Sequence, residues 1–346
     1  MKLKEICLVV FSFLILFEKA NGATFTERCS DPNVVFCFGF DDLAVTEKGF
    51  YKAHEPEKCS DGVCKSIDEQ VKVSGVGSLR MEIPSNTYAN TSGGWRSNFS
   101  DDYSIQFGEG EAFYVQWRQR FSSSMINTVY KNSAGAGGWK TVIIGEGDRS
   151  GYNAGSCTKL EVVINNYAYR GFPRGYAGCG SWRNFDTRYG SFDFKLQNMV
   201  DNGAEAGAFQ YCLYSTATKN AERPVPGCFP FVADNWMTFQ VKIKVGNWSA
   251  ANSEIEIWAG IQGQSSVHII KRTDMIIDQQ SANSKYGKVW FLPYNTSKDP
   301  SFSHEVGYTW YDDLIVSKSK IADPTDQINF VTPSTPKNVV LKRLVN

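Results

Sequence analysis

The side chains best suited to chemistry in this sequence are arginine, lysine, glutamine and tyrosine residues that alternate with apolar ones. The clearest case is FYVQWRQRF at residues 113–121, because alternate side chains of a β-strand point to opposite faces. One face here carries Phe113, Val115, Trp117 and Phe121, and the other carries Tyr114, Gln116, Arg118 and Arg120. Arginine offers paired donors that match carboxylates, and its polar neighbours can bond to hydroxyl groups. The pattern predicts a ligand-binding surface, although a solvated outer sheet would show the same alternation.

A second segment with this alternation lies at residues 160–166, where Asn165 and the following Tyr167 fall on the polar side. Between the two segments, Lys140 begins the otherwise apolar stretch of GGWKTVIIGEG. A lone lysine at such a place is often an exposed strand end. Its position between two polar-faced strands nevertheless predicts that Lys140 shares a functional site with Arg118 and Asn165.

Two further candidates, Tyr294 and His304, lie near the C-terminal end of the chain. Histidine is the one side chain whose unperturbed pKa lies near neutrality, so His304 is the best general base that the sequence offers. The residue could equally cap the turn before Gly307. The other two histidines, His54 and His268, are expected to be structural.

Two acidic doublets stand apart from this group, Asp41-Asp42 at the end of the first predicted strand and Asp312-Asp313 inside the last. First and last strands often neighbour one another in sandwiches, and carboxylates that meet there could hold calcium together with backbone oxygens. Turn capping explains the first doublet as well. The sequence thus predicts Asp42 and Asp313 as ligands of a structural Ca²⁺, and no cofactor is required.

Short strands broken by Gly, Asn, Asp and Ser position these residues, and no helical period of useful length occurs after about residue 34. The predicted strands are 34–40, 78–83, 112–121, 140–145, 160–166, 237–245, 253–259, 268–277, 288–293 and 308–317. This number of strands without a repeat or linker predicts an all-β fold, a single sandwich of two antiparallel sheets over residues 23–322. Residues 323–346 are expected to form a C-terminal tail, either packed over the sandwich or loose.

Charge and the N-terminal segment narrow the class of protein. Thirty-six basic and 36 acidic residues leave no net charge, so nucleic acid is not an expected partner. Lys2 and Lys4 precede an apolar run at 6–17, and small residues follow it, which predicts a signal peptide over 1–22. This run is too short for a membrane anchor. A secreted protein is therefore expected.

Cysteines and sequons agree with export. Eight cysteines remain once Cys7 is removed, and an even number in an exported chain favours disulfides, which we expect between nearest neighbours. A zinc site is the weaker alternative, because the spacing lacks the common two-residue gap and a histidine pair. The four N-glycosylation sequons are Asn90, Asn98, Asn247 and Asn295, which predict a glycoprotein.

Six segments, taken in order, resemble the concanavalin A-like jelly rolls of secreted carbohydrate-active proteins. They are FYVQWRQRF, GGWKTVIIGEG, LEVVINNYAYRGFPRGY, SEIEIWAG, VWFLPYNT and YTWYDDLIVSKSKIADP. The resemblance covers about residues 34–324 and extends more distantly to alginate and glucuronan lyases. It implies a concave sheet that forms an open cleft for a polysaccharide, expected to be acidic.

The lyases of this group neutralise a uronate carboxylate and remove the C5 proton, so that the chain is cleaved by β-elimination. By this resemblance, Arg118 and Gln116 match the polar central strand, Lys140 matches a lysine that follows a glycine pair, and Asn165 matches a groove position. Tyr294 and His304 complete the catalytic set by their chemistry. The binding set is Tyr114, Gln116, Arg120, Asn165 and Tyr167.

Two other functions stay open on the same fold. A retaining glycoside hydrolase needs two carboxylates about 5 Å apart, but Glu146-x-Asp148 is followed by Gly151 where a third carboxylate is expected. A lectin would need only aromatic and hydrogen-bonding side chains on a concave face.

Overall fold

The computed structural model describes residues 22–51, 53–130, 137–167, 169, 171–179 and 229–325. Fifteen β-strands and a few single-turn helices make up this part of the chain. Arg170, Cys212, Cys228, the side chain of Tyr167, and nearly all of the predicted signal peptide and tail lie outside the described residues. The all-β prediction is confirmed.

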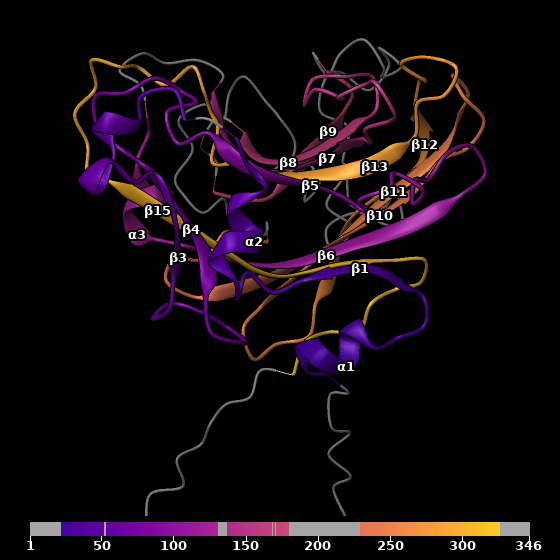
Figure 1. Cartoon of the computed structure of the whole chain (residues 1–346), viewed down its shortest axis with the longest axis horizontal. Helices are drawn as coiled ribbons and strands as arrows, with labels where there is room; N and C mark the ends of the chain where they lie inside the picture. Colours follow the sequence, from indigo (N-terminus) through magenta and orange to yellow (C-terminus); the bar gives the residue numbers. More distant parts are fainter. Residues whose placement is uncertain are drawn as a thin grey trace, which may run out of the picture.

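The strands form two antiparallel sheets that are stacked as two layers (Figure 1). The first is an eight-stranded sheet with the order β12-β11-β10-β6-β15-β4-β3, in which β1 also pairs with β15. Its strands are β1 (Val34–Phe38), β3 (Lys65–Asp68), β4 (Ser78–Ile83), β6 (Ala112–Phe121), β10 (Trp236–Lys244), β11 (Ala251–Ile261), β12 (Val267–Ile276) and β15 (Gly307–Ser317).

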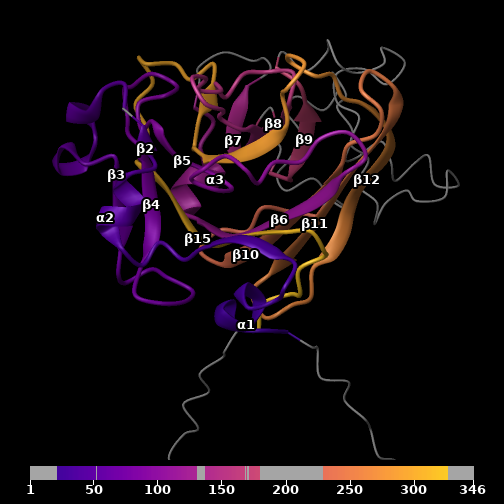
Figure 2. The ribbon, with the colours of Figure 1, turned by 45° about the vertical axis from the view of Figure 1, so that its right-hand side comes forward.

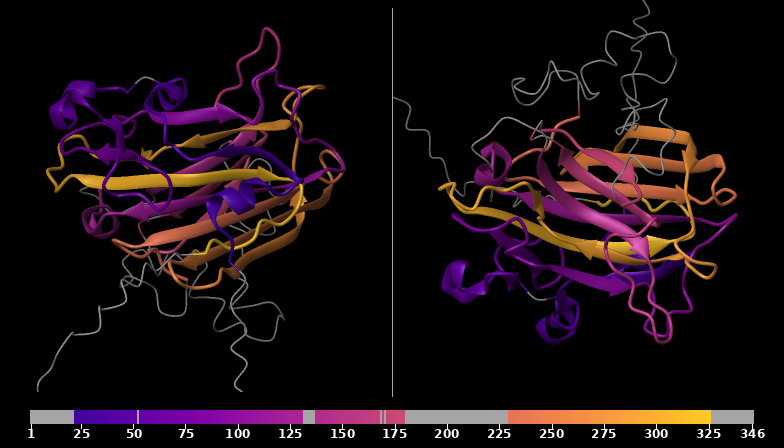
Figure 3. Two further views of the ribbon diagram at one scale, coloured as in Figure 1. Left: turned by 60° about the horizontal axis from the view of Figure 1, so that its bottom comes forward. Right: turned by 90° about the horizontal axis from the view of Figure 1, so that it is seen from above.

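The second is a seven-stranded sheet with the order β2-β5-β13-β7-β8-β9, in which β14 also pairs with β7. Its strands are β2 (Phe50–Tyr51), β5 (Gly94–Asn98), β7 (Gly138–Glu146), β8 (Glu161–Tyr167), β9 (Arg174–Ala177), β13 (Tyr286–Phe291) and β14 (Asn295–Thr296). Seen from above, β13 in gold runs between β5 in purple and β7 and β8 in magenta (Figure 3, right).

Short helices occupy the loops and ends of the sandwich. They are α1 (Phe25–Cys29), α2 (Leu43–Glu47) and α3 (Ser123–Asn127), with two 3-10 turns at Pro56–Lys58 and Ser60–Gly62. Side-chain caps begin the three α-helices, because Thr24, Asp42 and Ser122 each accept a hydrogen bond from a backbone amide in the first turn. The helix α1 lies on the side of the eight-stranded sheet that faces away from the core (Figures 1 and 2).

The main hydrophobic core lies between the two sheets, where the alternation of each strand places its apolar side chains. From β6 it takes Phe113, Val115 and Trp117, and from β7 it takes Val142 and Ile144, all of them buried. Each such side chain contributes about 1.5–3 kcal/mol relative to an exposed one. Alternation therefore turns the intervening residues of each sheet outward.

All ten predicted strands are present, with ends that differ by up to two residues from those predicted. The prediction missed β2, β3, β5, β9 and β14. The segment GWRSN of β5 lacks β-branched residues and contains Gly and Asn, so only Trp95 in its composition favoured a strand. The residues of β5 nevertheless pair along β13 near the middle of their sheet.

The cysteine prediction is confirmed where it can be checked. Disulfides join Cys29 to Cys37, Cys59 to Cys64 and Cys157 to Cys179, which are nearest neighbours in the sequence. At the C-terminal end, the Ala23 amide donates to the Asp323 carbonyl at 2.9 Å, so the first residues of the predicted tail pack on the domain. No helix in the described ranges is long and apolar enough to cross a membrane.

Candidate functional site on the seven-stranded sheet

The outer face of the seven-stranded sheet carries a second apolar cluster with polar side chains around it. The buried residues Ile143, Val163, Trp290 and Leu292 come from β7, β8, β13 and the residue just after β13. They alternate with residues of the main core, so they must point to the opposite side of the sheet. Three tyrosines pack against this cluster and remain partly exposed: Tyr51, Tyr176 and Tyr294.

Lys140 lies among these tyrosines. Its ammonium nitrogen is 5.3 Å from the ring centroid of Tyr294 and 5.8 Å from that of Tyr176. The Lys140 amide also donates to the Tyr294 carbonyl at 2.9 Å, which ties the strand to the loop after β13. Asn165 of β8 is the cross-strand partner of Lys140. The structure thus brings together three predicted residues, Lys140, Asn165 and Tyr294, on one face.

Burial changes the acid-base properties of this group. It lowers the pKa of Lys140 from its ordinary value, and the negative charge of Glu161 opposes that change. Burial raises the pKa of Tyr176, and the negative charges of Glu161 and Tyr294 raise it further. The free amine of Lys140 is therefore easier to form than in water, while the phenol of Tyr176 keeps its proton. An amine base and a phenol acid thus lie on one surface.

A tryptophan extends the site across the sheet. Trp290 is 1% exposed and lies over Gly145, where a Cβ atom would come within 2.8 Å of the indole ring. Glycine at this position lets the ring lie flat against β7. On the next strand, the guanidinium of Arg96 is 5.8 Å from the ring centroid of Tyr51, so both belong to this face.

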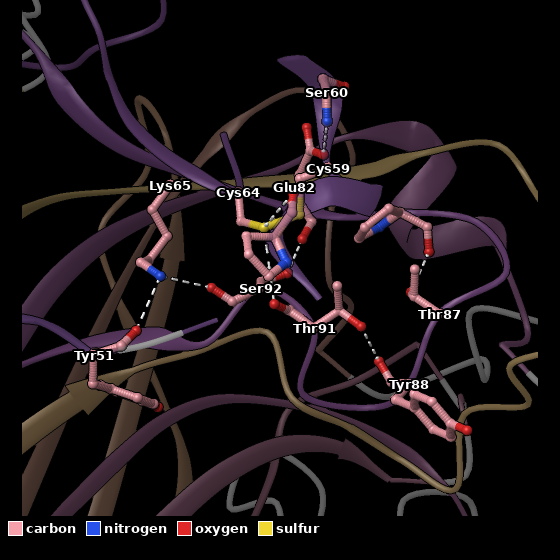
Figure 4. The surroundings of a disulfide bond; sticks show 12 residues. Tyr51, Cys59, Ser60, Cys64, Lys65, Glu82, Thr87, Tyr88, Thr91 and Ser92 are labelled. Atoms are coloured by element: carbon pink, nitrogen blue, oxygen red, sulfur yellow. Dashed lines mark hydrogen bonds between the residues drawn. A yellow bond between two sulfur atoms is a disulfide. The ribbon is translucent and has the colours of Figure 1, made fainter. Parts of the chain in front are cut away.

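The loop with the Cys59–Cys64 disulfide supports Tyr51 (Figure 4). From the strand that follows this disulfide, Lys65 donates to the Tyr51 and Ser92 carbonyls, each at 3.0 Å. Burial lowers the pKa of Lys65 to about 8. These bonds hold β2 against β5, and thereby place the Tyr51 ring beside Arg96.

A polar network closes one end of the same sheet. The Lys288 ammonium forms a buried ion pair with Asp148, and the Asn98 amide donates to that carboxylate at 2.8 Å. A cavity of about 490 Å³ adjoins the network and is also lined by Arg96.

Tyr286 points into the main core beside Phe113, because a bulge between Tyr286 and Lys288 reverses the alternation.

The expectation that β6 contributes to the same cleft is wrong. Arg118 belongs to the eight-stranded sheet, whereas Lys140 and Asn165 belong to the seven-stranded sheet. The side chains of β6 alternate as predicted, but its polar face is covered rather than open. Gln116 accepts a hydrogen bond from Arg28 and donates to the Ala322 carbonyl, and both Gln116 and Arg118 are buried.

The two ends of that polar face are also separate from the Lys140 site. Tyr114 lies 6.4 Å from the Trp258 ring, measured between ring centroids. Arg120 lies over Trp310 and forms a 3.8 Å ion pair with Asp234. Since the two sheets enclose the core between them, these side chains lie on the opposite side of the molecule from Lys140.

The acidic doublets also have protein partners of their own. The first and last predicted strands do pair, β1 with β15, as expected. Asp42 caps α2 by accepting from the Val45 amide at 3.1 Å, while Asp313 pairs with Arg28 at 2.5 Å. A cavity of about 330 Å³ lies beside Asp313 and Arg118. Within the described residues, no three acidic, histidine or cysteine side chains gather as metal ligands.

His304 lies in a loop near one end of the sandwich. Its ring packs edge-on against Tyr130, with centroids 4.7 Å apart, and stacks on Phe302. Its Nδ1 atom is 2.6 Å from the Glu305 carbonyl, and burial lowers the pKa of the imidazole. None of the contacts found for His304 in the described part of the chain joins it to Lys140 or Tyr294.

Sequence reasoning left out four residues of this face: Arg96, Glu161, Tyr176 and Trp290. Glu161 and Trp290 were visible in alternating segments, and they could have been found by extending the polar side of each strand. Arg96 and Tyr176 lie on β5 and β9, which were not predicted as strands. Their place on the face follows only from the pairing of the sheet.

No protein family and no curated protein matches the sequence. Solved structures do match in fold. The marine PL-14 alginate lyase from Aplysia kurodai superposes with a TM-score of 0.50 at 12% identity, over 82% of this chain and 98% of that one. The endo-β-1,4-glucuronan lyase from Trichoderma reesei superposes with a TM-score of 0.40 at 12% identity, over 78% of this chain and 92% of that one.

The catalytic domain of a glycoside hydrolase family 131 protein from Coprinopsis cinerea gives a TM-score of 0.42 at 10% identity, over 85% of this chain and 98% of that one. At 12% identity, the match to the alginate lyase from Aplysia kurodai shows the fold alone. The chain is a concanavalin A-like jelly roll that distantly resembles those of polysaccharide lyases.

Proposed function

We propose that this protein is a polysaccharide lyase that cleaves a uronate-containing chain by β-elimination on the outer face of the seven-stranded sheet. The observation that carries the proposal is the position of Lys140, half-buried between the rings of Tyr176 and Tyr294. The resemblance in fold to the alginate lyase from Aplysia kurodai supports the choice of substrate class.

Lys140 is the base in this mechanism. Its amine takes the C5 proton of the uronate unit, and Asn165, across the strand pair, is placed to hydrogen bond to the sugar carboxylate as charge develops there. The C5 electron pair forms the C4–C5 double bond as the C4–O4 bond breaks. Tyr176 supplies the proton that the departing O4 takes. The products are an unsaturated uronate and a new chain end.

The charges of the face suit an anionic chain. Lys140 of β7 and Arg96 of β5 are both partly exposed, so two cations on different strands face an incoming chain. The aromatic rings of Tyr51 and Tyr294 are partly exposed and offer surfaces on which sugar rings stack. A chain that crosses the strands would meet both kinds of contact.

The first test is a search for unsaturated uronates. The purified protein is incubated with alginate, glucuronan, ulvan and glycosaminoglycans while the ultraviolet absorbance of the new double bond is followed. We expect absorbance to rise with at least one of them. Binding without any such rise would favour the lectin, whereas new reducing ends without absorbance would favour the hydrolase. Either outcome would overturn the proposal that the protein is a lyase.

Lys140→Ala tests the assignment of the base. Loss of a general base typically costs 10²–10⁴-fold in rate, so we expect kcat to fall by at least about 100-fold. The matched control is Lys271→Ala, because Lys271 is exposed on β12 of the other sheet. Wild-type kcat in Lys140→Ala, with the control also active, would remove Lys140 from the mechanism.

The hydrolase has less support in the geometry. Of the two carboxylates that it would use, Glu146 accepts from Ser284 at 2.6 Å and pairs with Arg149, and Asp148 pairs with Lys288. Both are thus engaged in the network at the end of the sheet, and neither is free to act as a nucleophile.

A further inference from the structure

The cavity of about 490 Å³ at the end of the seven-stranded sheet has no part in the mechanism proposed above. It lies where the sheet has an open edge. The strand β2 pairs with β5 only at Gly94 and Trp95, so among the described residues no strand flanks Ser97 and Asn98 on the side away from β13. The volume is within the range of cavities that hold small ligands. The cavity is thus a place for a ligand beside the Lys140 site.

Apolar and aromatic side chains make up one part of its lining. Phe36 and Phe38 of β1 are partly exposed, and their rings stack with centroids 6.2 Å apart. Val45 of α2 and Tyr103 also line the cavity, and the Tyr103 side chain is 39% exposed. Rings of this kind offer flat apolar surfaces on which a sugar ring can pack.

Charged side chains make up the other part of the lining, and they do not balance. They are Lys48, Arg96, Asp101, Asp148 and Lys288. Lys288 and Asp148 neutralise one another as a buried ion pair. The other three are exposed or partly exposed, and within the described part of the chain none of them forms an ion pair. Two cations therefore face one acid, and the cavity suits a ligand that carries a single negative charge.

Arg96 connects the cavity to the outer face that carries Lys140. Its guanidinium is 5.8 Å from the ring centroid of Tyr51, which packs on the outer apolar cluster. The register sets Arg96 opposite Trp290, and Trp290 opposite Ile143 of β7. Arg96 is therefore two strands across and three residues along from Lys140, a span of roughly 14 Å at ordinary strand spacings. A chain bound at Lys140 must extend by further sugar units to reach the cavity.

We propose that this cavity is a distal subsite, which binds one acidic sugar unit of a polysaccharide that lies across the seven-stranded sheet. Arg96 and Lys48 contact the carboxylate of that unit, and Tyr103 packs on its ring. The inference rests on the proposed function for the class of ligand, but it requires binding and not cleavage. Its consequence is that chains long enough to reach the cavity bind more tightly than short ones.

The first experiment measures affinity against chain length by calorimetry. The ligands are di- to hexasaccharides of alginate and of glucuronan, and the protein carries Lys140→Ala so that no ligand is cleaved. We expect the hexasaccharide of at least one polymer to bind roughly tenfold more tightly than its disaccharide, since a second set of contacts then acts on the same chain. Equal affinity at all lengths, or no binding of any oligosaccharide, would overturn the proposal.

Single substitutions in that protein assign the gain to the cavity. Removal of a cation should raise the Kd of the hexasaccharide, roughly threefold in Lys48→Gln and roughly tenfold in Arg96→Gln. Asp101→Asn removes a like charge and should lower the Kd roughly twofold. A purely structural effect would not change sign with the charge that is removed. The matched control is Lys271→Gln, because Lys271 is exposed on β12 of the other sheet. An unchanged Kd in both Lys48→Gln and Arg96→Gln would contradict the subsite.

Asn98 allows an independent check, because it begins a sequon and also lines the cavity. Its Nδ2 atom donates to the Asp148 carboxylate at 2.8 Å, and its Oδ1 atom accepts from the Asp148 amide at 3.0 Å. A glycan on Nδ2 would occupy the space that the proposal gives to the ligand. Mass spectrometry of protein from a eukaryotic secretory host should find Asn98 unmodified, and a glycan there would rule the subsite out.

Failure of this proposal can be told apart from failure of the proposed function. If the oligosaccharides bind with the expected dependence on length, but protein with Lys140 intact forms no unsaturated product, the lyase fails and the subsite stands. If product forms while the Lys48 and Arg96 variants bind the hexasaccharide as well as their parent, the subsite fails and the lyase stands.

Discussion

At the scale of single residues, the site depends on how burial changes ordinary side chains. Lysine in water is an ammonium and tyrosine a phenol, and neither is a strong catalyst near neutral pH. On the outer face of the seven-stranded sheet, burial lowers the pKa of Lys140 and raises that of Tyr176. The two residues are thereby separated into a base and an acid.

This separation predicts the pH dependence of the reaction. The base must be unprotonated, so kcat/KM should rise with pH as Lys140 loses its proton, at a pH below the ordinary lysine value of 10.5. The acid must be protonated, and the raised pKa of Tyr176 keeps it so throughout that range. A profile that falls between pH 6 and 9 would contradict these assignments.

Tyr176→Phe checks the acid separately. Phenylalanine keeps the ring beside Lys140 but has no proton to donate, so kcat should fall by about 100-fold or more while KM changes little. Tyr294→Phe is the matched variant, because Tyr294 packs on Lys140 from the other side. Equal losses in both variants would contradict a distinct role of the Tyr176 hydroxyl as the acid, and no loss in either would indicate that the two rings only pack against the lysine.

At the scale of elements, pairing within the sheets decides which polar strand faces which side. The strand β6 alternates between apolar and polar residues, and β7 carries Lys140 before an apolar run, yet the two strands belong to different sheets. The polar face of β6 is covered by the segments around Arg28 and Ala322, so it has become an internal polar layer. On the outer face of β7, Lys140 remains partly exposed.

A pair of arginine variants tests this division. Arg118 is 1% exposed in the covered layer, so Arg118→Ala should lower the free energy of unfolding by about 2 kcal/mol and leave kcat unchanged. Arg96 is partly exposed beside Tyr51, so Arg96→Ala should raise KM and leave stability within about 0.5 kcal/mol. Thermal melts and steady-state kinetics measure both. The reverse pattern would place the site on the eight-stranded sheet.

At the scale of the whole molecule, the three disulfides of the described residues and backbone bonds between the segments around Ala23 and Asp323 brace the sandwich. Cys29–Cys37 ties α1 to β1, which pairs with β15. The Ala23 amide donates to the Asp323 carbonyl, and the Ala23 carbonyl accepts from the Thr325 amide. The view from below shows β15 in yellow running the length of its sheet (Figure 3, left). The segments around Ala23 and Asp323 thus support the sheet that lies opposite the proposed site.

The accessibility of the four sequons across the molecule predicts where glycans attach on a eukaryotic secretory route. Asn247 is exposed, whereas Asn295 is fully buried and its amide donates to the Pro293 carbonyl at 3.0 Å. A glycan on Asn295 would have to open the pairing of β14 with β7. We expect mass spectrometry of the folded protein to find glycan on Asn247 and none on Asn295. Full occupancy at Asn295 would contradict the placement of β14.

The sequence by itself determined the class of fold, ten of the strands, the nearest-neighbour disulfides that can be checked, and the grouping of Lys140, Asn165 and Tyr294. These follow from local information, since alternation and spacing are properties of short segments. It could not decide that Arg118 and Lys140 lie on opposite sheets, or that Arg96 and Tyr176 join the Lys140 face. Only the tertiary structure decided those points, because the sheet that a strand joins, and what covers its polar side, depend on pairing with segments far away in the chain.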